Sequence, residues 1–237
     1  YADGDIRTKK ATNIAVSNGS AIDVAKDVNL AIDMLSNDWN INSTASDKAV
    51  TAVSVDENGS LTVANMGNVT FRTSGTSATG LYAGISADGE ATDKASITIN
   101  RNGANTLTFD GNGSNDYTVI KAGKQGNITI NSLVKLSDEL QNSTKTTIFD
   151  ADGGNITYAG RGANVLKTGG YLVKANNGAQ VKLGDLNYGG ADVLQGDILV
   201  NKGTSAGSDT TSVFLSVNKN QQWTGSVGGD GSFAMRM

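Results

Sequence analysis

The fold class is decided by three similar words: Gly67-Asn68-Val69-Thr70-Phe71, Gly126-Asn127-Ile128-Thr129-Ile130 and Gly154-Asn155-Ile156-Thr157-Tyr158. Each word begins with glycine and asparagine, which accept the left-handed backbone of a sharp turn, and continues with apolar, polar and apolar residues. This period of two places both apolar side chains on one face of a strand and the threonine on the other. The words therefore predict short strands that begin directly after turns and bury one face.

Words of the same pattern recur along the rest of the chain, at Ile97-Thr98-Ile99, Leu107-Thr108-Phe109, Val181-Lys182-Leu183 and Val213-Phe214-Leu215. One series repeats about every 28 residues, through Val69, Ile97, Ile128, Ile156, Val181 and Val213. Each interval holds two further short apolar strands, for example at Val119-Ile120 after Leu107, Leu172-Val173 after Val165, and Ile198 to Val200 after Val193. Three strands per repeat predict an all-β solenoid, a right-handed parallel β-helix in which each coil buries its inward face against its neighbours.

The composition supports this fold and argues against most enzyme classes. The chain has 237 residues with 30 Gly and 5% aromatics, and it has no Pro, which suits strands that are hydrogen-bonded on both sides. It has no Cys and no His, so it lacks thiolate nucleophiles, zinc clusters of these residues and the commonest general base. We therefore expect a protein that is not an enzyme and has no catalytic, cofactor-binding or metal-binding residues.

Charge and hydropathy argue against nucleic acid and membrane as partners of this chain. The net charge is −4 and the basic residues are scattered, so the sequence does not predict nucleic-acid binding. No apolar run approaches the roughly 20 residues of a membrane-spanning helix, and no export signal opens the chain. We expect a fragment or processed product whose export signal lies elsewhere, with no membrane insertion of its own.

The amino-terminal segment is less regular than the rest. Residues 1–58 are expected to form a cap or the first irregular coils, and residues 59–237 the body of the β-helix. Apolar residues between Val24 and Leu35 fit either a short helix or strands, and the sequence leaves both open. Any helix is expected within residues 1–58.

Three glycine-rich words resemble known sites. Gly203-Thr204-Ser205-Ala206-Gly207 has the spacing of a nucleophile elbow, but without a histidine base Ser205 is interpreted as part of a turn. The segment from Asp110 to Asp116 alternates oxygen-bearing side chains as a calcium loop does, but Lys121 stands where such a loop needs glutamate, and the sequence does not decide whether it binds calcium. Gly228 to Phe233 begins like a calcium-binding nonapeptide and is interpreted as a turn.

Parallel β-helices also include glycan-cleaving enzymes, which need clustered carboxylates with Arg or Lys on one face. The candidates are Asp150, Asp152, Arg161 and Asp185, which lie in unrelated words. A deep acidic groove would favour this alternative, whereas a long polar face would favour a binding protein.

Near the carboxyl end, Trp223-Thr224-Gly225-Ser226-Val227 resembles the W-x-G-x-V word near the end of autotransporter passenger domains. The resemblance, together with the coil words and the absence of cysteine, covers most of residues 59–237. It implies secretion to a bacterial surface and anchoring through a carboxyl-terminal outer-membrane barrel. Neither that barrel nor a serine-protease word is present in this sequence.

The function expected from this resemblance is adhesion at the cell surface. Autoaggregation and biofilm formation would follow from self-association with identical passengers, and binding to host glycan or matrix protein is the other possible contact. The polar flank of the rod is the expected interaction face, and the sequence does not identify the contacting residues. Trp223 is expected to cover the apolar end of the last coil rather than to form the adhesive contact.

Overall fold

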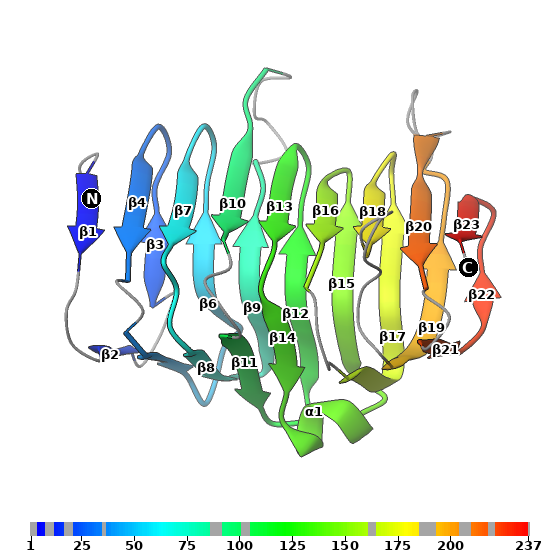
Figure 1. Ribbon diagram of the computed structural model, residues 1–237, viewed down its shortest axis with the longest axis horizontal. Helices are drawn as coiled ribbons and strands as arrows, with labels where there is room; N and C mark the ends of the chain where they lie inside the picture. The colour runs from blue at the N-terminus through cyan, green and yellow to red at the C-terminus, as the bar shows by residue number, and fades with distance from the viewer. Residues whose placement is uncertain are drawn as a thin grey trace.

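The computed structural model describes residues 4–7, 12–16, 21–34, 37–85, 92–100, 105–160, 165–184, 193–203, 210–217 and 221–236, with side chains from residue 21 onward. Strand accounts for 63% of the structure and helix for 3%. The strands form three parallel sheets, and successive coils stack along one axis from the amino-terminal to the carboxyl-terminal end (Figure 1). The predicted parallel β-helix is confirmed.

Sheet A contains nine strands, in the order β1 (Gly4–Arg7), β4 (Asn29–Asp33), β7 (Ser60–Ala64), β10 (Ala95–Ile99), β13 (Gly126–Ile130), β16 (Asn155–Tyr158), β18 (Gln180–Leu183), β20 (Ser212–Ser216) and β23 (Ser232–Arg236). Sheet B contains β14 (Leu133–Leu136), β11 (Thr106–Gly111), β8 (Val69–Ser74), β5 (Trp39–Thr44) and β2 (Thr12–Val16). Sheet C contains β21 (Gln222–Thr224), β19 (Val193–Val200), β17 (Val165–Asn176), β15 (Thr146–Asp152), β12 (Asp116–Ala122), β9 (Ser77–Ala83), β6 (Val50–Val55) and β3 (Ile22–Val24), and β22 (Val227–Gly228) also pairs with β19.

The predicted series of stacked residues is correct for five of its six members. In sheet A, Ile97 pairs with Ile128, and the column continues through Ile156, Val181 and Val213. Val69 was wrongly included, because it lies in sheet B beside Trp39 and Leu107, and Leu61 takes its place in the column. Strands of sheets A and B share the same apolar-threonine-apolar pattern, so the pattern does not distinguish the two sheets.

Tight turns join sheet C to sheet A at the same corner of successive coils. Asp27, Asn58, Gln125 and Asn177 each occupy the left-handed region there, with φ between 55° and 61°. Asparagine and aspartate tolerate this conformation better than most residues do. Two connections at this corner are longer: the one from β9 to β10 runs from Gly84 to Lys94, and the one from β19 to β20 runs from Asn201 to Thr211.

Residues before 58 contribute strands β1 to β6 to the same three sheets. The Val24–Leu35 segment contains the end of β3 and the whole of β4, so the helical alternative is excluded for its described residues. The described helix is α1 (Asp138–Asn142), and the expectation of helix within residues 1–58 is therefore wrong. Two acidic residues in its first turn suit the helix dipole, and fully buried Leu140 anchors it to the core.

Helix α1 marks a change in the coils. Before it, each coil passes through separate strands of sheets B and C. After it, β17 and β19 are single strands of twelve and eight residues, with register shifts between Lys167 and Val173. The sequence predicted separate strands at Val165 and Leu172, and at Val193 and Ile198. Each pair instead lies on one strand, so the three-strand pattern is wrong for these coils.

Candidate functional site

The outer face of sheet A carries two columns of uncharged polar side chains over four consecutive coils. Register places Ser60, Ser96, Asn127 and Asn155 in one column and Thr62, Thr98, Thr129 and Thr157 in the other. These eight side chains, which we call the sheet A field, are half-buried or exposed and alternate with the buried apolar residues of the same strands. Neighbouring rungs of a sheet lie about 4.8 Å apart, so the field repeats its hydroxyl and amide groups at that spacing.

Hydrogen bonds between coils order this face. The amide of Asn155 donates to the side-chain oxygen of Asn127 at 3.0 Å, and the hydroxyl of Ser60 donates to Asn29 at 2.6 Å. A further ladder joins Asn131 to Asn100 at 3.3 Å. Asparagine side chains of successive coils are thus hydrogen-bonded to one another.

The outer face of sheet C has a different chemistry. Register aligns Tyr82, Lys121, Asp150 and Lys174 in one column, and the ammonium of Lys174 lies 4.4 Å from the centre of the Tyr171 ring. Burial raises the pKa of Asp150, and the two flanking lysines oppose that rise. The column therefore alternates charge on a face that also carries aromatic rings.

Of the glycan-cleavage candidates, the structure places Asp150 and Asp152 on the same strand, β15, where Asp152 accepts a hydrogen bond from the Asn177 amide. Arg161 and Asp185 lie outside the described residues. Sequence reasoning missed the two lysines beside Asp150. Their signal was present in aligned words that each end in alanine: Leu81-Tyr82-Ala83, Ile120-Lys121-Ala122, Phe149-Asp150-Ala151 and Val173-Lys174-Ala175.

A pocket of about 370 Å³ opens at the corner between sheets C and A. It is lined by Lys26, Asp56, Glu57, Tyr82, Gly84 and Ile85. It lies where the long connection from Gly84 to Lys94 replaces the tight turn that the neighbouring coils have at this corner. We call it the corner pocket; no motif in the sequence pointed to it.

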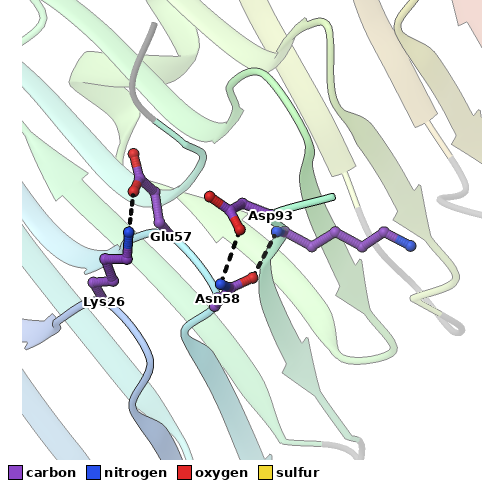
Figure 2. A network of polar contacts seen from close by, with 5 residues as sticks. Lys26, Glu57, Asn58 and Asp93 are labelled. Carbon is purple, nitrogen blue, oxygen red and sulfur yellow. Dashed lines mark hydrogen bonds and ion pairs between the residues drawn. The ribbon is translucent and has the colours of Figure 1, made fainter. Parts of the chain in front are cut away.

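Polar contacts hold the walls of the corner pocket (Figure 2). The Lys26 ammonium lies 3.2 Å from a Glu57 carboxylate oxygen, which joins the turns of two coils. The Asn58 side chain donates to Asp93 at 3.0 Å and accepts from the Lys94 backbone amide at 3.3 Å. Asn58 therefore fastens the end of the long connection to the turn that carries Asp56 and Glu57.

The pKa values of three ionisable groups in the pocket are raised by their surroundings. Burial raises the pKa of Asp56, and the carboxylates of Asp23 and Glu57 raise it further. Burial also raises the pKa of Tyr82, with a smaller contribution from Asp56. The pKa of Lys26 is raised by its hydrogen bond to Glu57 and by the charge of that carboxylate. The lining thus combines a phenol, an ammonium and two acidic side chains.

The calcium-like loop from Asp110 to Asp116 has many contacts within the chain. Arg72 lies 3.4 Å from the Asp110 carboxylate, and the side-chain oxygen of Asn112 accepts the Ser114 amide at 2.9 Å. The ammonium of Lys145 donates to the Ser114 carbonyl at 2.8 Å. Two cationic side chains thus lie against loop oxygens, and no group of three potential metal ligands occurs among the described residues.

The structure describes two of the three remaining motifs. Ser205 lies outside the described residues. In the Gly228–Phe233 word, residues 229–231 form the turn between β22 and β23, with Gly229 at φ 96°, and the other residues belong to these strands. Trp223 packs against the core, lies at a tilt of 43° to the Phe233 ring with ring centroids 5.8 Å apart, and donates its indole N–H to the Gly196 carbonyl at 3.2 Å. The ring therefore covers apolar surface of the last coil described.

No protein-family model, curated protein or solved structure matches the chain. Within the part of the chain that the structure describes, no helix has the length and apolar character needed to cross a membrane.

Proposed function

We propose that this chain is an adhesin passenger domain of the autotransporter type, secreted to the bacterial surface and anchored by an outer-membrane barrel outside this sequence. Its role is cell adhesion by self-association, which leads to autoaggregation and biofilm formation. The sheet A field is the contact face. The observation that supports this proposal is that four consecutive coils present hydroxyl and amide groups in register, uncharged up to Thr157, beyond which the threonine column continues to Lys182.

An uncharged field suits contact between identical copies. A two-fold contact brings the same surface patch of both copies together, so an uncharged patch meets its copy without opposing like charges. The Lys121, Asp150 and Lys174 column of sheet C avoids opposing like charges only in a register that sets lysine against aspartate. Serine, threonine and asparagine both donate and accept hydrogen bonds, so the field can complement itself. Many weak bonds repeated along the rod add up through multivalency between cells.

The test displays the chain on a non-aggregating bacterial host through an unrelated surface anchor. The triple variant Thr98→Lys, Thr129→Lys, Thr157→Lys places three positive charges on each facing field, so we expect clumping to fall at least tenfold at low salt and to recover partly at high salt. The matched control is Thr51→Lys, Thr79→Lys, Thr118→Lys, which alters a threonine column of sheet C. Equal clumping of the two variants at equal surface amounts would refute the sheet A field as the contact.

One observation favours the alternative function, glycan cleavage. Asp150, with a pKa raised by burial, lies between Lys121 and Lys174, an arrangement of the kind that acid-base chemistry uses. Incubation of the purified chain with neutral and uronic-acid polysaccharides, followed by a reducing-end assay, separates the two functions. We expect no new ends; activity that Asp150→Asn abolishes would make the chain an enzyme.

A further inference from the structure

The corner pocket exists because one coil breaks the pattern of its neighbours. Where the adjacent coils carry a turn of a few residues between β6 and β7 and between β12 and β13, the chain leaves β9 at Gly84 and returns to β10 at Ala95. The turn that carries Asp56 and Glu57 therefore has the Lys26 turn on one side and the longer connection on the other. The pocket lies beside this turn, and the contacts that join Lys26 to Glu57 and Asn58 to Asp93 fix the positions of these residues (Figure 2).

Glycines set the position of the Tyr82 ring in this space. A Cβ atom added at Gly84 would lie 2.5 Å from the Tyr82 hydroxyl oxygen, and one added at Gly123 would lie 2.9 Å from it. Both distances are shorter than real contacts, so a side chain at either position would require the half-buried Tyr82 ring to shift. The result is an aromatic side chain held beside the Asp56 and Glu57 turn.

The lining combines an aromatic ring, the apolar side chain of Ile85, carboxylate acceptors and an ammonium donor. A sugar ring needs this combination, because its C–H face packs on apolar or aromatic surface while its hydroxyls donate to carboxylates and accept from cations. The volume of about 370 Å³ is at the small end of ligand pockets and suits one or two sugar residues. With two carboxylates and one ammonium, the lining disfavours anionic sugars.

We infer that the corner pocket binds a neutral sugar residue, with Tyr82 as the packing surface, Asp56 as a hydroxyl acceptor and Lys26 as a donor held by Glu57. This site is separate from the sheet A field, and it does not depend on self-association. It adds a second kind of contact, recognition of a glycan, to the chain.

Saturation-transfer difference NMR on the purified chain tests this assignment with the methyl glycosides of glucose, galactose, mannose and N-acetylglucosamine, and with glucuronic acid for comparison. We expect saturable binding of at least one neutral glycoside and at least tenfold weaker binding of glucuronic acid. Asp56→Asn should weaken the neutral sugar at least tenfold, because it replaces a charged acceptor at an exposed turn with an amide of equal size. Tyr82→Ala should weaken it similarly, and Tyr82→Phe should weaken it less, because the ring is kept.

The matched control is Asp47→Asn, which removes an exposed carboxylate at a bend outside the pocket lining and should leave binding unchanged. Absence of saturable binding by all the neutral glycosides would overturn the assignment, and so would equal binding by the Asp56→Asn and Asp47→Asn proteins. The lysine variants of sheet A are expected to bind the sugar normally. Loss of clumping with retained sugar binding therefore separates the two proposals, as does the reverse result.

Discussion

The coils before helix α1 and those after it surround their cores with different numbers of strands. Up to Leu136, each coil has three separate strands, and its core is filled from three sides. From Val165 onward, one continuous strand, β17, takes the place of separate strands of sheets B and C. Its Leu166, Leu172 and Val173 are fully buried. Register shifts near Gly169 and Gly170 replace the corner between sheets B and C.

The difference appears in the interior. The three-strand coils enclose an apolar cavity of about 30 Å³, to which Val53, Val63, Met66, Val69 and Phe71 contribute. The indole N–H of buried Trp39, another lining residue, has no hydrogen-bond partner among the described residues. Side chains that converge from three sheets must match in length across the axis, and here they leave a gap. Regular three-strand coils are therefore not automatically the best packed.

The largest effect is expected for Ile128→Asp, at the middle of the sheet A column. Ile128 is 1% exposed and lies between Ile97 and Ile156, so the variant places an unpaired charge in a stacked apolar column. We expect a loss of about 4 kcal/mol or more of unfolding free energy. Urea unfolding followed by circular dichroism measures it, with the outward Thr129→Asp as control.

The shape of that transition sharpens the comparison. A single transition means that the coils on both sides of α1 unfold together, whereas two transitions mean that they are separate units. An unchanged midpoint for Ile128→Asp would show that the register is wrong.

Trp223→Ala tests the end of the second region. The variant loses the ring contact with Phe233 and the hydrogen bond to Gly196, and because Trp223 is only half-buried we expect a loss of about 2 kcal/mol. Trp223→Phe should recover part of it. Cells that display the variant should still clump; unchanged stability with lost clumping would instead place the adhesive contact at this tryptophan.

A smaller effect of opposite sign in the two regions is expected for one added methyl group. Val53 and Val173 occupy the same inward column of sheet C and are both buried, but Val53 lines the cavity and Val173 does not. Val53→Ile should raise the unfolding free energy by about 1 kcal/mol, whereas Val173→Ile should lower it by about 1 kcal/mol. Thermal melts of both proteins decide this, and equal shifts would mean that the two interiors are packed alike.

The smallest effect concerns pH. Burial raises the folded-state pKa of Asp150, so its contribution to stability is full below the unfolded pKa of about 3.9 and is lost as pH rises through the folded value. The backbone amide and hydroxyl of Ser226 lower the pKa of Asp197, so its contribution is present above the unfolded pKa and is lost as pH falls through the folded value.

The change in melting temperature caused by Asp150→Asn should therefore be more favourable at pH 7 than at pH 3. The change caused by Asp197→Asn should be less favourable at pH 7 than at pH 3. Melting temperatures at the two pH values measure both. The same sign for the two variants would contradict the assigned environments.

Much of the fold was predictable from local pattern. Alternation at Ile128-Thr129-Ile130 indicated a strand with one buried face. The glycine-asparagine pairs of the three words are not left-handed: Gly126-Asn127 and Asn155 lie in strands, and the left-handed residue is the preceding Gln125 or Gly153. Helix α1 was not predicted, because five residues are too few for a periodic signal. The corner pocket was not predicted either, since Lys26, Asp56 and Tyr82 come from three different coils.

The sequence by itself determined that the chain forms stacked, parallel, one-sided strands, because a period of two and the turns between strands are properties of neighbouring residues. Only the tertiary structure decided which strand lies above which. Connections differ in length from coil to coil, so backbone hydrogen bonds between rungs, and not a constant repeat, set the register. That register assigned Val69 to sheet B, aligned Asp150 with two lysines, and gathered the uncharged columns of sheet A on one face.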